Sequence, residues 1–261
     1  MMKKYFVIGN PIDHSLSPKL HNYWFKKNNI NAVYEKKKLE EKELKNFIDN
    51  LRKDKIHGIN VTVPFKNKVI KYLDKLSLEV ETTESVNTIY KNGDEIIGHN
   101  TDVAGFELGL RHSKINVLHK HVLILGAGGV VPSIVYSLLS MGCKKIFLSN
   151  RTIEKAENIK KKFNEVEILK WGEIPDFDIV INATSVGLKG DSLDLEFNVK
   201  NKIFYDVIYN PKETQFLKKA KQEGNKVENG RFMFVYQANQ SFSIWNNVIP
   251  KIDDEVLKIL G

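Results

Sequence analysis

Short runs of β-branched and aromatic residues alternate along the chain with longer segments in which apolar residues recur at helical spacing. The predicted strands lie at residues 5–8, 32–35, 58–63, 86–90, 95–98, 121–125, 145–149, 179–182 and 203–207. The predicted helices lie at residues 18–28, 41–53, 66–72, 101–111, 131–141, 153–163, 214–222, 232–248 and 253–260. Strands that alternate with helices form βαβ units, so the pattern predicts an α/β protein with mostly parallel sheets covered on both faces.

The length of 261 residues allows two domains, since a domain most often has about 100–150 residues. Residues 110–120 are polar and weakly periodic, and they precede a very apolar strand that opens a new unit. We expect a first domain over residues 1–103, a second over 104–232, and closing helices over 233–261 that pack on one of the two.

The composition is that of a globular protein, with 42% hydrophobic and 28% charged residues. No apolar stretch approaches the roughly 20 residues that a membrane span requires. The apolar run at residues 5–8 is too short for a signal peptide, which predicts a cytoplasmic location. The single cysteine, Cys143, excludes an intramolecular disulfide and a thiolate metal cluster, and we expect no metal.

The net charge of +8 permits a nucleic-acid partner without requiring one. Basic residues exceed acidic ones by 18 to 14 in residues 1–103 and by 22 to 18 in residues 104–261, so the excess is evenly spread. The lysine blocks at residues 36–38 and 160–162 are typical of solvated faces. We therefore predict a small-molecule partner and neither nucleic acid nor a membrane; the sequence leaves the oligomeric state open, a homodimer included.

A glycine-rich turn follows the apolar strand at residues 121–125, in the order Gly126-Ala127-Gly128-Gly129. Glycines let the backbone approach a pyrophosphate, and the following helix offers N–H groups at its start, so this context predicts a dinucleotide site. A strict fingerprint has Gly or Ala where this chain has Val131. A glycine turn without a ligand is the alternative.

The next strand ends in Asn150-Arg151-Thr152, with Lys155 one helical turn later. An NAD site usually has an acidic residue there, whereas an arginine favours the 2′-phosphate of NADP(H). The alternative is that Thr152 caps the next helix and Arg151 is a surface charge.

Polar residues recur in the first part where predicted strands end and helices begin. Ser17 occupies the expected N-cap position before Pro18, and with Ser15 it offers two hydroxyls to a small carboxylate; a well-capped helix is the alternative. The other segments are Asn60-Val61-Thr62-Val63-Pro64-Phe65-Lys66, Val86-Asn87-Thr88 and Asn100-Thr101-Asp102. Open α/β sheets bind ligands at the carboxyl ends of their strands, although Asn, Thr and Ser also serve as turn residues there.

Together these segments resemble the shikimate dehydrogenase family, and the matches keep their order from residue 9 to residue 245. The matching segments are Gly9-Asn10-Pro11, His14-Ser15-Leu16-Ser17-Pro18 with His21-Asn22, Asn60-Val61-Thr62-Val63-Pro64 with Lys66, Val86-Asn87-Thr88, Asn100-Thr101-Asp102 with Gly105, Gly126-Ala127-Gly128-Gly129, Asn150-Arg151-Thr152, Asn182-Ala183-Thr184-Ser185 with Gly187, and Gln237-Ala238 with Phe242 and Trp245.

The resemblance implies NADPH-dependent, reversible reduction of 3-dehydroshikimate to shikimate in the pathway to aromatic amino acids. It implies a substrate-binding and catalytic domain over residues 1–103, a Rossmann-type doubly wound NADP domain over 104–232, and C-terminal helices that return to the first domain. The implied catalytic pair is Lys66 and Asp102. The implied substrate ligands are Ser15 and Ser17 for the carboxylate, Asn60, Thr62, Asn87 and Gln237 for the hydroxyls, and Tyr209 nearby. The implied NADP(H) ligands are Gly126, Ala127, Gly128, Gly129, Val130, Asn150, Arg151, Thr152 and Lys155, with Val207 and Gly230 at the nicotinamide.

The chain departs from the family pattern at a few positions. Val130 and Val131 replace small residues after the glycine turn, Phe232 replaces the second glycine of Gly-x-Gly-Met, and Tyr236 replaces a smaller residue. None of these is in the implied catalytic pair. Two alternatives stay open: an enzyme that also accepts quinate, and a binding or regulatory module of the same fold without catalysis.

Overall fold

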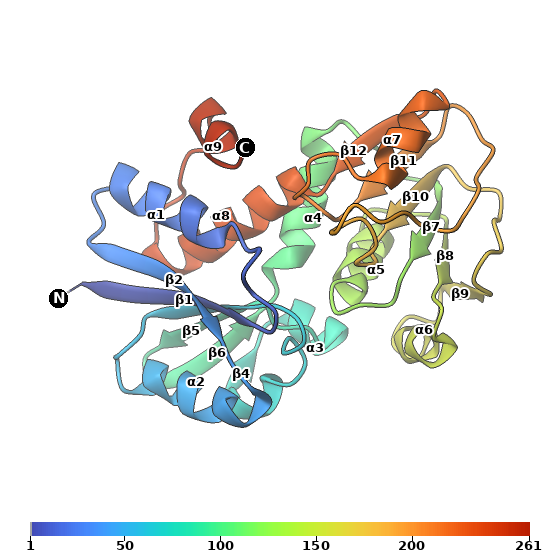
Figure 1. Cartoon of the computed structure of the whole chain (residues 1–261). Coiled ribbons are helices and arrows are strands. Elements are labelled where there is room, and N and C mark those ends of the chain that lie inside the picture. Colours follow the sequence, from blue (N-terminus) through green and yellow to red (C-terminus); the bar gives the residue numbers. More distant parts are fainter. Residues whose placement is uncertain (1) are drawn as a thin grey trace. The chain divides into compact units, whose positions relative to one another are not determined.

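The computed structural model describes residues 2–261, and its helices and strands are built around two six-stranded sheets (Figure 1). The chain divides into two units: the first runs to Ala104 and resumes at Val235–Gly261, and the second is Gly105–Phe234. The chain passes from the first unit to the second within helix α4 (Thr101–His112) and returns to the first within helix α8 (Arg231–Asn246). The first unit is therefore discontinuous in sequence, whereas the second is continuous.

The sheet of the first unit has the strand order β2-β1-β3-β5-β6-β4. Its strands are β1 (Lys3–Gly9), β2 (Ala32–Lys38), β3 (Gly58–Val61), β4 (Lys75–Leu76), β5 (Thr88–Asn92) and β6 (Glu95–His99). Strand β5 is antiparallel to both β3 and β6, whereas the other three pairings are parallel, so this sheet is mixed. The reason is local: only two residues join β5 to β6, and Gly93 supplies the positive φ of 59° that this hairpin uses.

The side chains of β1 alternate between the two faces of this sheet. Phe6 meets Phe47 of α2 (Leu44–Arg52) edge to face, with ring centroids 5.4 Å apart. On the other face Tyr5 packs against Phe25 of α1 (Ser17–Lys27) and Trp245 of α8, at 5.1 Å in each case. Figure 1 shows α1 and α8 on one side of the sheet and α2 on the other.

The sheet of the second unit has the strand order β12-β11-β10-β7-β8-β9, and every pairing is parallel. Its strands are β7 (His121–Leu125), β8 (Lys145–Ser149), β9 (Val166–Leu169), β10 (Ile179–Asn182), β11 (Ile203–Asp206) and β12 (Lys226–Asn229). One face packs on α5 (Val131–Ser140) and α6 (Ile153–Lys160), and the other on α7 (Gln215–Gln222). This is the predicted Rossmann-type doubly wound fold, and the α/β class is confirmed.

The helix predicted at residues 66–72 is wrong. Phe65 and Val69 have helical spacing, and a hydrogen bond does run from Val69 N to the carbonyl of Phe65. The next bonds span only three residues, and the segment closes as a 3₁₀ turn at Ile70–Tyr72. The short elements β4, β9, β12, η1 (Glu41–Glu43), α3 (Leu78–Thr83) and α9 (Asp254–Ile259) complete the structure; of these, the sequence pattern did not single out β4, β9, β12 and α3.

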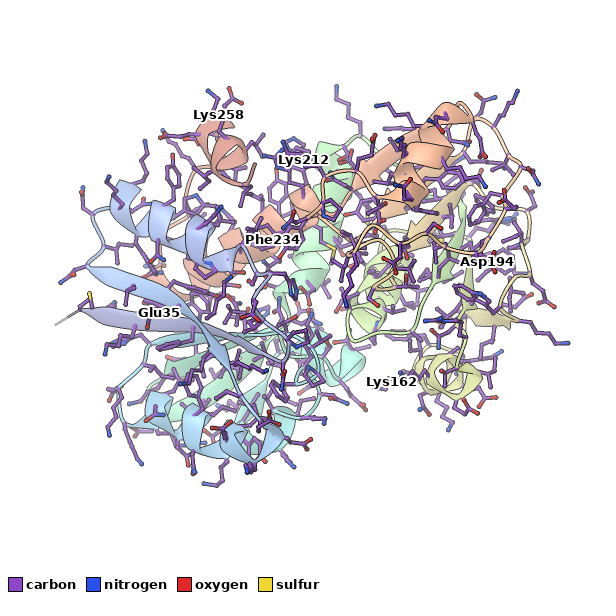
Figure 2. The ribbon with its side chains drawn as sticks, viewed as in Figure 1. Glu35, Lys162, Asp194, Lys212, Phe234 and Lys258 are labelled. Atoms are coloured by element: carbon purple, nitrogen blue, oxygen red, sulfur yellow. The ribbon has the colours of Figure 1, made fainter. Side chains whose placement is uncertain are left out.

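Among residues 2–261, no helix combines the length and the apolar character that crossing a lipid bilayer demands. Charged side chains such as Glu35, Lys162, Asp194 and Lys258 are exposed and project outward from the ribbon (Figure 2).

Candidate functional site

An ion pair between Lys66 and Asp102 is at the centre of the polar side chains of the first unit. It joins Lys66 Nζ to Asp102 Oδ2, and the two side chains are only 12% and 9% exposed. Phe65 and Val69 are buried on either side of the lysine and fix its segment, while Asp102 lies in the first turn of α4, where the helix dipole favours a negative charge. Lys66 is therefore held in place and is not a solvated surface lysine.

Asn87 holds the aspartate from its other side. Its Nδ2 donates to Asp102 Oδ1 at 2.9 Å and to the hydroxyl of Thr101 at 2.9 Å, and Gln237 Oε1 lies 3.4 Å away. Its Oδ1 accepts from the Thr101 backbone N–H at 2.7 Å. Because the side chain of Asn87 is 3% exposed, these contacts fix its amide and bring Lys66, Asp102, Asn87 and Gln237 together.

Asn60 is the start of a second group of buried hydrogen bonds. Its Oδ1 accepts from the Tyr34 hydroxyl at 2.7 Å, and its Nδ2 lies within 3.1 Å of three acceptors, among them Thr88 Oγ1 and the Ser241 hydroxyl of α8. Ser241 in turn contacts Thr88 and Thr101. The structure thus engages both polar atoms of Asn60 inside the unit and ties α8 to β3, β5 and the start of α4.

The two serines of the predicted carboxylate seat are adjacent. Ser15 Oγ and Ser17 Oγ lie 3.2 Å apart, just before and at the start of α1, and both residues are buried. The N-cap position belongs to Leu16 and not to Ser17 as predicted, because Ser17 is already helical and donates its backbone N–H to Ser15 Oγ at 3.3 Å. Thr62 follows β3, and its hydroxyl makes no hydrogen bond within residues 2–261.

The glycine turn of the second unit packs against the end of β10. Gly126 has a φ of 102°, and a Cβ there would lie 2.9 Å from the backbone carbonyl of Ala183. Gly128 and Gly129 are exposed, and α5 begins two residues later at Val131. Val131 is fully buried in the core, so the helix–strand contact accommodates the larger side chain. The turn is a backbone cradle at a helix N-terminus of the kind that binds phosphate groups.

Arg151 and Lys155 lie after the carboxyl end of β8, Arg151 just before α6 and Lys155 in its first turn, and both are exposed. Neither forms an ion pair with a carboxylate among the described residues. Thr152 occupies the N-cap position of α6 without a side-chain capping bond, and the Asn150 side chain donates to the Thr152 carbonyl at 2.6 Å. These two charges are available to an external anion.

Val207 and Tyr209 lie in the segment after β11, beside the start of α8. A Cβ on Gly230 would lie 2.1 Å from the Val207 carbonyl oxygen, so only glycine allows this approach. Tyr209 stacks on Phe234, with ring centroids 4.2 Å apart and planes 18° apart. Figure 2 labels Phe234 on α8 and Lys212 on the segment that carries Tyr209.

Two residues of these networks, Tyr34 and Ser241, were not singled out from the sequence, and Thr88 and Thr101 were named there only as members of polar segments. Ser241 stands four positions after Gln237 and so shares its helical face, which is the one sequence signal that points to it. Among residues 2–261, no group of three or more His, Cys, Asp or Glu side chains is arranged to hold a metal ion.

Comparisons with known proteins agree over the whole chain. A family model described as the shikimate dehydrogenase substrate binding domain matches residues 7–89, and one described as shikimate/quinate 5-dehydrogenase matches residues 109–188. A relative from Pelagibacter ubique, named shikimate dehydrogenase (NADP(+)), is 55% identical over 263 aligned positions, which cover 100% of this chain and 99% of the relative.

Solved structures give the same result. Shikimate 5-dehydrogenase from Listeria monocytogenes, in complex with shikimate and NAD, is 31% identical with a TM-score of 0.91 and covers 100% of this chain and 96% of that chain. Shikimate 5-dehydrogenase from Thermus thermophilus, in complex with NADP(H) and shikimate, is 27% identical with a TM-score of 0.89 and covers 99% and 98%.

Proposed function

Because the chain belongs to the shikimate dehydrogenase family, we propose that it catalyses the reversible, NADPH-dependent reduction of 3-dehydroshikimate to shikimate. The observation that carries this proposal is the buried Lys66–Asp102 pair, which a binding module without catalysis has no need to maintain. The first unit then binds the substrate and the second binds NADP(H).

Lys66 supplies the proton of the reaction. When bound, NADPH delivers a hydride to the ketone carbon, and the negative charge that develops on the ketone oxygen requires a proton at the same time. The Lys66 ammonium donates that proton and becomes the neutral amine, which solvent protonates again. In the oxidative direction the neutral amine removes the proton from the substrate hydroxyl.

Asp102 positions the Lys66 ammonium group relative to the substrate. Its Oδ2 contacts Lys66 and its Oδ1 accepts from Asn87, so the carboxylate is held at both oxygens. Gln237, at the edge of the same group, and Asn87 orient the substrate hydroxyls. The hydroxyl of Thr62, which makes no hydrogen bond within residues 2–261, is free to bind the same substrate. Asn60 supports these side chains through its buried hydrogen bonds.

Ser15 and Ser17 bind the substrate carboxylate. Their adjacent hydroxyls lie at the N-terminus of α1, where helix N–H groups and the helix dipole favour a negative charge. This seat and the ion pair belong to the same unit, so the carboxylate fixes the ring relative to the proton donor. Tyr209, in the second unit, is a further proposed substrate ligand.

The residues of the second unit fit NADP(H). The pyrophosphate would lie on the turn formed by Gly126, Ala127, Gly128, Gly129 and Val130, whose exposed glycines leave room for it. Asn150, Arg151, Thr152 and Lys155 would hold the adenosine ribose and its 2′-phosphate. Val207 and Gly230 would line the nicotinamide end, where Gly230 allows the close approach of the two segments.

The enzyme acts in the cytoplasm as part of aromatic amino-acid biosynthesis, and a homodimer is compatible with its fold. The decisive experiment follows NADPH absorbance after 3-dehydroshikimate is added to the purified protein. NADH in place of NADPH, and 3-dehydroquinate in place of 3-dehydroshikimate, are run in parallel. Fast oxidation with NADPH and 3-dehydroshikimate is expected, equal rates with 3-dehydroquinate would indicate the broader quinate/shikimate enzyme, and no oxidation with any pair would leave the binding module.

A further inference from the structure

Asp206 is a buried carboxylate that the proposed reaction does not use. It is the last residue of β11, its side chain is fully buried, and three donors converge on it. Its Oδ1 accepts from the Ile208 backbone N–H at 3.0 Å, while its Oδ2 accepts from the Thr214 hydroxyl at 2.7 Å and from Asn182 Nδ2 at 3.1 Å. These donors come from the segment that carries Tyr209, from the start of α7 and from the end of β10.

Asn182 extends this arrangement into a second segment. Its Nδ2 donates to both Asp206 and the Val186 carbonyl, and its Oδ1 accepts from the Thr184 N–H and the Thr184 hydroxyl. All the hydrogen-bonding capacity of the amide is therefore used. The orientation of Asn182, and with it the segment at residues 183–187, is fixed by the carboxylate beside it.

Close packing joins these two segments to the proposed cofactor cradle. Gly126 of the glycine turn approaches Ala183 so closely that a Cβ would lie 2.9 Å from its carbonyl. A Cβ on Gly187 would lie 3.0 Å from Thr214 and 3.2 Å from Ile208, and Gly230 packs on Val207. The glycine turn, the segment at residues 207–209 and Gly230 all carry proposed ligand contacts. Each of them belongs to, or packs against, a segment that is hydrogen-bonded to Asp206 directly or through Asn182.

We propose that Asp206 is a positioning residue: its carboxylate locks residues 183–187 and 207–214 together, so that Val207 and Tyr209 are held in place relative to the glycine turn. This inference rests on the proposed function for the roles of Val207 and Tyr209. Asp206 acts through these neighbours and touches neither substrate nor cofactor.

The ionised carboxylate is the form that suits three donors, because it accepts at both oxygens and has no proton of its own. Burial raises the pKa of the Asp206 carboxyl to about 6, and the hydrogen bonds from Thr214, Ile208 and Asn182 oppose that rise. Above this pH the carboxylate prevails. An asparagine in its place presents an N–H₂ group to the donors of Thr214 and Asn182; the hydroxyl of Thr214 can turn, but the Asn182 amide loses an acceptor.

The test compares Asp206→Asn with Asp178→Asn at pH 8. Asp178 lies next to the opposite end of the same sheet, where it accepts from the His121 backbone N–H at 2.9 Å, so its removal is a matched loss of a carboxylate anchor. For Asp206→Asn we expect kcat/KM for shikimate to fall about 10- to 100-fold, with a raised KM, while NADP⁺ affinity measured by fluorescence changes less. Asp178→Asn should keep the kinetic constants of the unmodified protein.

Thr214 provides a rescue pair. Thr214→Val removes the hydroxyl and should lower kcat/KM in the same direction, whereas Thr214→Ser keeps the donor and should restore most of it. Thr214 also caps α7 by accepting from the Leu217 N–H, so the melting temperature is measured for both variants. If both Asp206→Asn and Asp178→Asn melt earlier but retain full kcat/KM, Asp206 is only a stabilising residue and the proposal is overturned.

Amide hydrogen exchange tests the same inference without any substrate. In Asp206→Asn the amides of residues 183–187 and 207–214 should exchange at least about 10-fold faster, and in Asp178→Asn they should not. Unchanged exchange in Asp206→Asn overturns the proposal. If exchange changes as expected but the unmodified protein oxidises no substrate, the locking of the two segments stands and the proposed function fails.

Discussion

The carboxyl ends of the two sheets hold their polar groups in different ways. In the first unit, side chains hold side chains: Lys66, Asp102, Asn87, Thr101 and Gln237 contact one another directly. In the second unit, glycines bring stretches of backbone together and Asp206 ties them, while the proposed phosphate ligands, Arg151 and Lys155, are exposed and form no ion pair within the described residues.

The difference reflects what each end has to do. A group that transfers a proton must be in place before the substrate arrives, and a buried network keeps it there. A group that binds a phosphate can meet it from solvent, since a long-range attraction between opposite charges guides the approach. Substitution of Lys66 should therefore lower turnover, whereas substitution of Arg151 and Lys155 should lower affinity for the cofactor.

The largest expected effect comes from Lys66→Met, which removes the proposed proton donor and keeps much of the side-chain volume. We expect kcat to fall about 10³-fold, within the range of general acid–base catalysis, while shikimate binding measured by calorimetry stays near that of the unmodified protein. Lys68→Met is the control, because Lys68 lies two positions away and pairs with Glu41 at the surface. Full turnover by Lys66→Met with normal binding would remove Lys66 from the mechanism.

The next effect tests the second unit. Replacing both Arg151 and Lys155 by alanine should raise the KM for NADPH about 10- to 100-fold and leave the KM for NADH within about 2-fold, because only NADPH carries the 2′-phosphate. The matched control replaces the exposed Lys160 and Lys161 in the same region. An unchanged preference for NADPH in the double variant would show that these two charges do not read the phosphate.

A smaller effect concerns stability alone and comes from a histidine in the interior of the first unit. His21 is fully buried, its ring nitrogens have no hydrogen-bond partner among residues 2–261, and it stacks on Tyr34 with ring centroids 4.3 Å apart; burial lowers its pKa to about 3. Between pH 6.5 and pH 3 the unfolded chain therefore binds a proton that the folded chain does not, so the free energy of unfolding falls as the pH falls.

We expect His21 to contribute about 1.4 kcal/mol of this loss between pH 7.5 and pH 5.5. The free energy of unfolding in urea is measured at pH 7.5 and at pH 5.5 for the unmodified protein and for His21→Phe. The decrease between the two pH values should be smaller in His21→Phe by about 1.4 kcal/mol. Asp206, whose pKa is raised by burial, has the opposite dependence, and it is the same in both proteins, so it cancels.

The smallest effect concerns an ion pair outside the network of the first unit. Arg52 donates through both Nη atoms to the Asp74 carboxylate at 2.7 and 2.8 Å, yet each side chain is 36% exposed. Arg52→Ala should cost no more than about 1 kcal/mol in unfolding free energy and leave kcat unchanged. A drop in kcat comparable with that of Lys66→Met would break the distinction between the buried pair and the surface pair.

The sequence predicts the second unit better than the first. Strands such as Val122–Leu125 are continuously apolar, as buried parallel strands are, and the glycine turn marks where the next helix begins. In the first unit, Phe65 and Val69 have helical spacing within a turn segment, and the hairpin at Gly93 depends on a local φ that periodicity does not record.

The candidate site divides in the same way. Lys66, Asp102 and Asn87 follow from the resemblance to a family, because each lies in a recognisable segment. Ser241 and Asp206 do not, since their partners are distant in sequence: Ser241 meets Asn60 and Asp206 meets Asn182. A single sequence carries no signal for such pairs, which only the folded chain brings within hydrogen-bond distance.

The discontinuity of the first unit has a consequence for how the protein is made. A ribosome releases residues 105–234 as one continuous stretch, so the second unit can fold during synthesis. The first unit cannot be completed at that point, because Trp245, which packs against Tyr5, and Gln237, beside Asn87, are still to come. The part of the chain that carries the ion pair is synthesised early but meets Gln237 and Trp245 only after residues 105–234 have been made, so a chain interrupted at residue 234 contains the whole second unit and an incomplete first unit.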